Sequence, residues 1–236
     1  MRAMADRLSG VLAAMAAVDG DAASVIDRVC MAATRVLSLN GAGLSLMVDG
    51  ELRGTAGATG PGIEVIQELQ LTLGQGPCVD AWRTGVPVTE PDLAEPALLR
   101  WPAFAQAAVA EGVRAVFAFP LRVGAIRIGV LALYRDGEGG LNADEFADGL
   151  VLAEVAVHLV LGLQAGAGPD ALHALLSTQP AHWAEVHQAT GMISAQLGVS
   201  LDEAFVRLRA VSFAENRQLR EVAGDVVARR LRLERP

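Results

Sequence analysis

The spacing of apolar residues predicts a larger α/β region followed by a purely helical one. The pattern of residues 43–48 and 51–57 predicts two strands that pair as a hairpin, joined by a tight turn at Asp49-Gly50. Two later runs, 115–121 and 126–134, are almost continuously apolar, which is typical of central strands covered on both faces.

Helical periodicity surrounds these strands. It predicts helices at residues 6–17, 22–37, 62–70 and 101–111. Asn142, with Glu145 three positions later, forms a capping pattern for a long helix that ends near Ala165. The pattern over residues 1–165 therefore predicts a mixed α/β (α+β) domain, in which helices flank a mainly antiparallel sheet.

Small residues and a proline after Ala165 predict a linker over 166–179. Beyond it, three helices account for residues 180–236, a small all-α module. The apolar stripe of the first is Val186, Ala189, Ile193 and Leu197, ended by Gly198. Ser200 and Glu203 cap the second, whose expected inner face is Leu201, Ala204, Phe205, Leu208 and Val211. Asn216 is expected to cap the third.

Charge is divided unequally between the two regions. All 19 basic residues are arginine, against 27 acids, which gives a net charge of −8. Residues 170–236 hold eight of each sign, so the first 169 residues carry the whole net charge. Because an acidic domain repels nucleic acid, any such binding belongs to the helical module.

Other residues bear on cofactors and location. Cys30 and Cys78 lack a CxxC pattern and suit a reducing cytoplasm, and the N-terminus has no signal-peptide pattern. The apolar run 149–165 is too short for a bilayer span and contains Glu154 and His158, so we predict no membrane segment. All four histidines follow residue 157, which disfavours a haem or metal in the sheet domain; no cofactor is predicted.

Several segments together resemble the GAF domain. They are 43–57, 73–78 (LGQGPC), 85–88 (GVPV), 92–93 (DL) and 115–134. The resemblance implies a six-stranded antiparallel sheet that senses a small molecule or a partner. It makes Cys78, Trp82, Phe117 and Phe119 candidates for lining the sensor pocket, although aromatic residues on central strands equally suit a plain core and a lone cysteine is usually inert.

The C-terminal region resembles the ANTAR domain over about 184–233. The matching segments are 187–192 (HQATGM), 198–205 (GVSLDEAF), 208–209 (LR), 216–219 (NRQL) and 222–223 (VA). ANTAR domains are three-helix RNA-binding modules of bacterial transcription antiterminators. The resemblance implies a homodimer whose paired modules hold tandem stem-loops in a messenger leader, so that a terminator hairpin cannot form.

Seven residues are candidates for RNA contact: Thr190, Gly191, Arg209, Ser212, Asn216, Arg217 and Arg220. If 217–235 is one helix, Arg217, Arg220 and Arg232 lie opposite its apolar stripe. Relatives frequently have lysine where this chain has Thr190. Gly191 inside a helix costs about 1 kcal/mol relative to alanine, which close approach of RNA or helix packing would offset.

Three alternatives remain open at this stage. The last two helices suit a DNA-binding helix-turn-helix, although the zero net charge of residues 170–236 is unfavourable for duplex DNA. Some GAF-like proteins resemble free methionine sulfoxide reductases, whose thiol chemistry needs two neighbouring cysteines. In the third alternative the chain is a protein-interaction sensor, whose sheet domain binds no small molecule and only dimerises. We predict a regulator and not an enzyme.

Overall fold

The computed structural model describes residues 2–18, 24–48, 51–94, 96–166, 181–215 and 217–233. The chain divides into two compact units, Met1–Leu176 and Ser177–Pro236. The predicted turn at Asp49-Gly50 and nearly all of the predicted linker, residues 167–179, lie outside the described residues.

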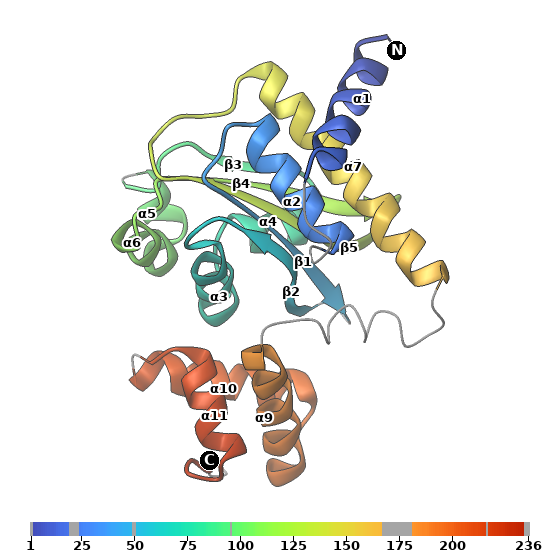
Figure 1. Cartoon of the computed structure of the whole chain (residues 1–236). Helices are drawn as coiled ribbons and strands as arrows, with labels where there is room; N and C mark the ends of the chain where they lie inside the picture. The colour runs from blue at the N-terminus through green and yellow to red at the C-terminus, as the bar shows by residue number, and fades with distance from the viewer. Residues whose placement is uncertain are drawn as a thin grey trace. The chain divides into compact units, whose positions relative to one another are not determined.

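An antiparallel sheet forms the centre of the first unit (Figure 1). Its strands are β1 (Gly41–Val48), β2 (Glu51–Thr59), β3 (Val88–Glu90), β4 (Ala115–Val123) and β5 (Ile126–Arg135), in the spatial order β2-β1-β5-β4-β3. The GAF resemblance implies six strands, and the described residues form five. Residues 115–121 and 126–134 are strands as predicted, and they pair with each other.

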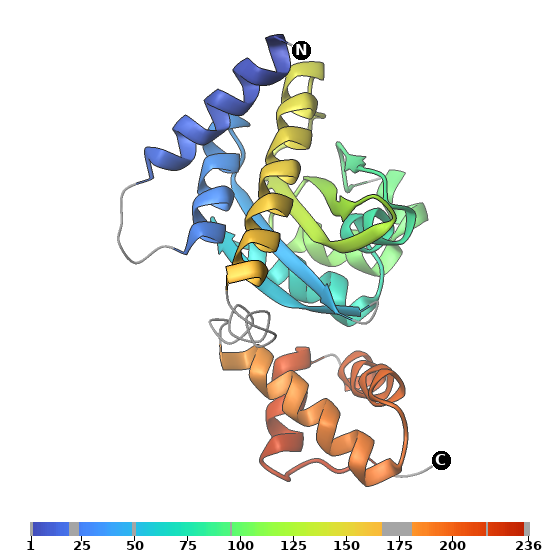
Figure 2. The same ribbon diagram turned by 90° about the vertical axis from the view of Figure 1, so that its right-hand side faces the viewer.

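Helices cover both faces of this sheet. They are α1 (Arg2–Ala16), α2 (Val25–Val36), α3 (Ile63–Leu73), α4 (Pro77–Thr84), α5 (Pro96–Arg100), α6 (Pro102–Ala110) and α7 (Ala143–Gly166). α2 and α7 cover one face, and α1 packs against both of them (Figure 2). α3, α4 and α6 cover the other face. This two-sided cover explains why β4 and β5 are almost continuously apolar.

The long helix α7 begins with the predicted capping arrangement. The Asn142 side-chain oxygen accepts hydrogen bonds from the amides of Asp144 and Glu145, each at 2.9 Å, and the Glu145 carboxylate accepts from the Asn142 amide at 2.7 Å. By length and composition alone α7 could cross a membrane. Four of its apolar side chains, those of Val151, Leu152, Ala156 and Val160, are buried in the core of the unit.

The second unit contains α9 (Ala181–Leu197), α10 (Leu201–Glu215) and α11 (Leu219–Val227). Its core consists of Val186, Ala189, Ile193, Leu197, Ala204, Phe205, Leu208, Leu219, Val222, Ala223 and Val226. Two details differ from the prediction. Leu201, expected to face inward, is 47% exposed at the first position of α10, and the buried face of the helix also includes Ser212. Gln218 occupies the N-cap of α11 in place of Asn216, which lies outside the described residues.

Candidate nucleic-acid interface and sensor core

Two predicted RNA contacts, Thr190 and Ser212, lie inside the helical unit. Thr190 is 3% exposed, and its hydroxyl donates to the Val186 carbonyl at 2.7 Å. Ser212 is 1% exposed, and its hydroxyl donates to the Arg217 carbonyl at 2.7 Å. Each hydroxyl is satisfied within the unit, so the expectation that these side chains face RNA is corrected: they hold a helix and a turn in place.

Arg217 lies in the turn before α11 and pairs with acids. Its guanidinium is 2.6 Å from the Asp225 carboxylate and 3.0 Å from that of Glu215, and these hydrogen bonds raise the pKa of Arg217. Arg230 contacts the same Asp225 at 2.7 Å. Hydrogen bonds from Arg217, then Arg230, lower the pKa of Asp225. The expectation that 217–235 is one helix is wrong, since α11 ends at Val227 and Arg217 and Arg232 lie beyond its two ends.

Gly191 lies on the outer side of α9, where it is partly exposed. A Cβ atom built there would meet no described atom within 4 Å. Helix packing within the described part of the unit therefore does not require glycine at this position. Glycine at position 191 costs about 1 kcal/mol in helix propensity relative to alanine, and packing within the described part of the unit does not offset that cost.

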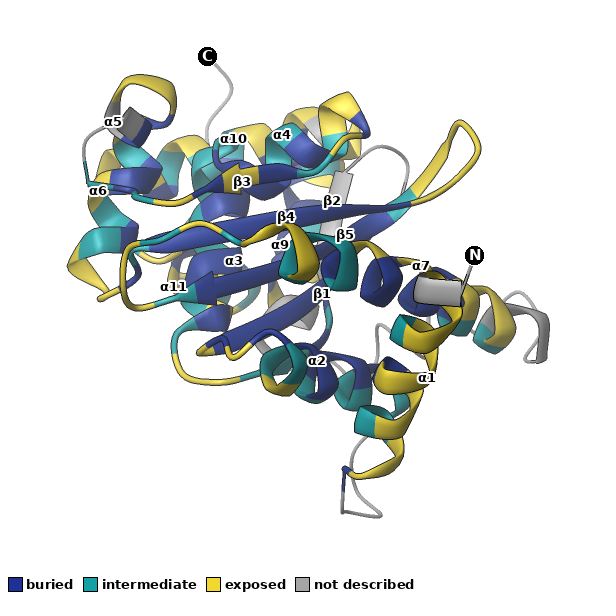
Figure 3. Ribbon diagram, turned by 90° about the horizontal axis from the view of Figure 1, so that it is seen from above, coloured by how far each residue is buried: buried dark blue, intermediate teal, exposed yellow. Residues whose placement is uncertain are grey.

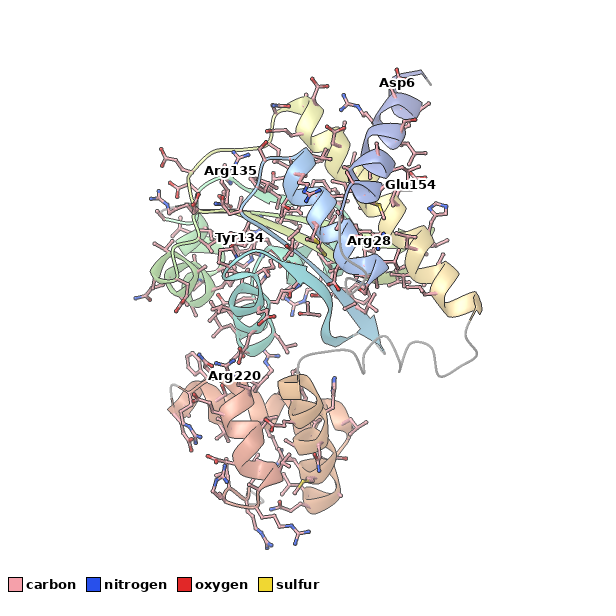
Figure 4. All side chains as sticks on the ribbon, viewed as in Figure 1. Asp6, Arg28, Tyr134, Arg135, Glu154 and Arg220 are labelled. Atoms are coloured by element: carbon pink, nitrogen blue, oxygen red, sulfur yellow. The ribbon has the colours of Figure 1, made fainter. Side chains whose placement is uncertain are left out.

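Arg209 and Arg220 remain as surface cations of the helical unit. Arg220 is exposed on α11, and no described carboxylate pairs with it (Figure 4). Arg209 is half-buried on α10, with its guanidinium carbon 5.9 Å from the centre of the Phe205 ring. Sequence reasoning missed Phe213, four residues further along, which is 68% exposed. The helical period could have found it, because 213 falls outside the apolar face of α10.

The four candidates for a sensor pocket divide between opposite faces of the sheet. Phe117 and Phe119 are fully buried on the α2 and α7 side, where the Phe119 ring lies 5.6 Å from that of Phe146. Cys78 and Trp82 belong to α4 on the other side. The four candidates therefore do not line one pocket. Phe117 and Phe119 are two positions apart on β4, so both point to the same face, where they belong to the core, whereas Cys78 and Trp82 pack on the opposite face.

Cys78 lies in the first turn of α4. Its amide donates to Gln70 Oε1 at 2.7 Å, and Gln70 Nε2 donates to its Sγ at 3.1 Å. Burial raises the pKa of the Cys78 thiol to about 12. Cys30, buried on the α2 side of the sheet, also has its pKa raised to about 12 by burial. Neither thiol is therefore ionised to the nucleophilic thiolate to any useful extent at neutral pH.

The sequence analysis also did not predict a buried polar cluster on the α3 side of the sheet. Gln67 of α3 is 2% exposed; it accepts a hydrogen bond from Thr55 at 2.6 Å and donates one to Ser45 at 2.8 Å. The three groups satisfy one another, which fixes α3 against β1 and β2. The available signal was that Gln67 follows Ile63 by four positions on the helical period, and so shares its buried face.

An antiparallel sheet covered by helices on both faces, followed by a three-helix unit, defines a modular protein with an α+β domain and a helical domain. The GAF domain family matches residues 20–159, and the ANTAR domain family matches residues 174–227. The chain belongs to the GAF family, and its GAF domain is followed by an ANTAR domain. This pairing makes it a signal-sensing regulator of transcription antitermination, a regulatory protein and not an enzyme.

Solved structures agree on the fold of the first unit. The GAF domain of an Acinetobacter phosphoenolpyruvate-protein phosphotransferase is 12% identical, with a TM-score of 0.53, over 70% of this chain and 97% of that one. The GAF domain of the Coxiella burnetii phosphoenolpyruvate-protein phosphotransferase is 16% identical, with a TM-score of 0.51, over 69% and 95%. At these identities the likeness shows the fold alone. No curated protein matches the chain.

Proposed function

We propose that the ANTAR domain binds stem-loops in nascent leader RNA, and that the GAF domain controls this binding in response to a small molecule or a protein partner. RNA held in this way would be unable to form the competing terminator hairpin. The observation that carries the proposal is the ANTAR domain over residues 174–227, behind a GAF domain. Because nascent RNA is the target, we also propose a cytoplasmic location.

Surface features of the helical unit support RNA binding. Arg220 is exposed without a described ionic partner, and Arg209 lies on the surface of α10. Gly191 leaves the backbone of α9 open to close approach. Guanidinium groups bind phosphate and stack on bases, whereas uncrowded backbone lets a nucleotide come near. Duplex DNA is the weaker candidate, since residues 170–236 carry no net positive charge.

Fluorescence anisotropy of the full chain would test the proposal. The labelled probes are tandem stem-loops, a single stem-loop and duplex DNA of the same sequence, all at one salt concentration. We expect the tandem RNA to bind most tightly. Arg220→Ala should weaken RNA binding, and Arg122→Ala, which removes an exposed arginine of the GAF domain, should not. Preference for DNA, or no RNA binding by either the full chain or residues 177–236, would overturn the proposal.

Gly191 offers a sharper variant because stability and binding should change in opposite directions. Gly191→Ala should stabilise the helical unit by about 0.5–1 kcal/mol, since alanine favours the helix and meets no described atom. The same variant should bind RNA more weakly, because the added methyl group blocks close approach. Gly162→Ala, at an equally open position of α7, is the matched control for binding. Unchanged affinity of Gly191→Ala would exclude this part of the interface.

We further propose that the chain is a homodimer and that α1 and α7 form its interface. Arg7 of α1 pairs with Asp144 and Asp148 of α7, so the two helices form one surface. Both helices expose large apolar side chains: Met4, Leu8, Leu12, Leu150 and Leu161. Figure 3 shows α1 largely exposed. α1 presents Met4, Leu8 and Leu12 at a spacing of four residues, a pattern that is suited to pairing with a second copy.

A further inference from the structure

Three side chains form a ladder along one side of α10. Phe205, Arg209 and Phe213 are spaced four residues apart, which places them on the same side of the helix in successive turns. The Arg209 guanidinium carbon lies 5.9 Å from the centre of the Phe205 ring. Phe205 is 7% exposed and Phe213 is 68% exposed. The ladder therefore runs from the edge of the core to solvent.

The exposure of Phe213 needs an explanation. The chain has six phenylalanines, and the other five are buried or half-buried. Leaving a large aromatic side chain in water forgoes the stabilisation that its burial would bring. The helix does not need it for its own core, since Ala204, Leu208 and Ser212 already face the other helices.

We propose that Phe213, together with Arg209, stacks on an unpaired base of the RNA stem-loop; this rests on the proposed function. Bases that are splayed out of RNA loops stack on aromatic rings and on guanidinium planes, and α10 presents one of each in adjacent turns. The positive charge of Arg209 suits the phosphates that flank such a base. A ring accepts any base, so this contact gives affinity for unpaired loops over duplex and does not select a base.

A second copy of the chain is the competing occupant. Val206, two turns earlier on the same side of α10, is 56% exposed and extends the apolar surface around Phe213. The patch is narrow, however, and Arg209 borders it, whereas a stable protein interface needs roughly 800 Å² from each partner. A single ring beside a guanidinium fits one base better than it fits a protein surface.

The test measures stacking directly in the full chain. A stem-loop carries 2-aminopurine at each unpaired position in turn, and its fluorescence and anisotropy are followed as protein is added. We expect quenching at one position. Phe213→Ala should abolish that quenching and weaken binding roughly ten-fold, the size of one lost base–aromatic stack. Phe213→Trp should retain both. Ile126→Ala, which removes a side chain 69% exposed on β5, is the matched control and should change neither.

Each other outcome separates the possibilities. If the unaltered chain binds RNA but Phe213→Ala keeps its affinity and quenching, stacking is wrong while the proposed function stands. If Phe213→Ala instead lowers the oligomeric mass in light scattering with RNA binding unchanged, the ring belongs to an interface between copies. If neither the unaltered chain nor residues 177–236 binds RNA, the proposed function fails and the stacking proposal fails with it.

Discussion

At the scale of single residues, burial decides what the two cysteines can do. Cys78 is enclosed between α3 and α4, where Gln70 contacts both its amide and its sulfur. Cys30 is enclosed on the other side of the sheet. A thiol reductase needs a thiolate and a second sulfur within reach. The sheet separates these two sulfurs, and both pKa values are raised to about 12.

We therefore expect neither thiol to react in the folded protein. At pH 8 a pKa of about 12 leaves roughly one thiol in ten thousand ionised, and the surrounding side chains also block reagents. Titration with a chromogenic disulfide should detect almost no thiol in native buffer and both thiols in urea. Rapid reaction of one thiol per native chain would contradict this. So would a disulfide between Cys30 and Cys78 after peroxide treatment.

Asp225 should make the stability of the helical unit depend on pH. Its pKa is lowered, chiefly by Arg217, so its contribution is present above the unfolded value near 3.8 and is lost as the pH falls through the lower folded value. Asp225→Asn should therefore melt earlier than the unaltered chain at pH 7, by a few degrees. The difference should shrink on acidification below the unfolded value.

Calorimetry of the full chain from pH 3 to pH 7 measures this difference. Glu203→Gln is the control, since its pair with Arg207 joins residues one turn apart on the same helix and should contribute little. A difference between Asp225→Asn and the unaltered chain that stays constant with pH would show that the carboxylate charge is not what stabilises the turn.

At the scale of elements, close approach fixes how α7 lies on the sheet. A Cβ atom at Gly149 would come within 2.4 Å of the Phe119 ring, which is fully buried and has no room to move. Gly162, in the same helix, has no described atom near its Cβ position. The two glycines thus occupy the same secondary structure, and only the first is required by packing.

This contrast predicts opposite effects for one substitution at two sites. Gly149→Ala should destabilise the chain by about 1–3 kcal/mol through overpacking. Gly162→Ala should stabilise it by about 0.5–1 kcal/mol through helix propensity. Urea unfolding followed by circular dichroism measures both. Stabilisation by Gly149→Ala would mean that α7 is free to move away from the sheet.

Element prediction succeeded where the hydrophobic pattern was long and failed where local geometry decided. The two central strands were predicted closely, because cover on both faces leaves a continuous apolar run. The eight-residue helix α4 and the three-residue strand β3 are too short to show a period. α11 ends eight residues before the predicted end, because Arg229 adopts a φ of +60° and the Arg230 amide bonds to the Asp225 carbonyl.

The candidate site shows the same division. The continuous apolar run of β4 predicted that both faces of the sheet would be covered, but it could not say which face Phe117 and Phe119 would reach. The predicted RNA contacts include Arg220 and Gly191, which lie on the surface, together with Thr190 and Ser212, which do not. A motif records which residue types recur, whereas burial depends on packing that no single segment encodes.

At the scale of the whole molecule, net charge is distributed unequally along the chain. The first 169 residues carry the whole net charge of −8 and contain the exposed leucines of α1 and α7, whereas residues 170–236 hold as many arginines as acids. If the GAF domain makes the dimer, each protein molecule brings two RNA-binding modules together. A second stem-loop on the same RNA then binds at a high effective concentration.

The preference for tandem stem-loops should therefore depend on residues far from the RNA. Leu8→Glu with Leu12→Glu places two charges in the exposed surface of α1 and should give a monomer by light scattering. Its affinity for a single stem-loop should be unchanged, because the ANTAR domain is unaltered. Its preference for the tandem probe should fall at least ten-fold, since the second contact is no longer intramolecular. A monomeric variant that kept the tandem preference would show that one ANTAR domain reads both stem-loops.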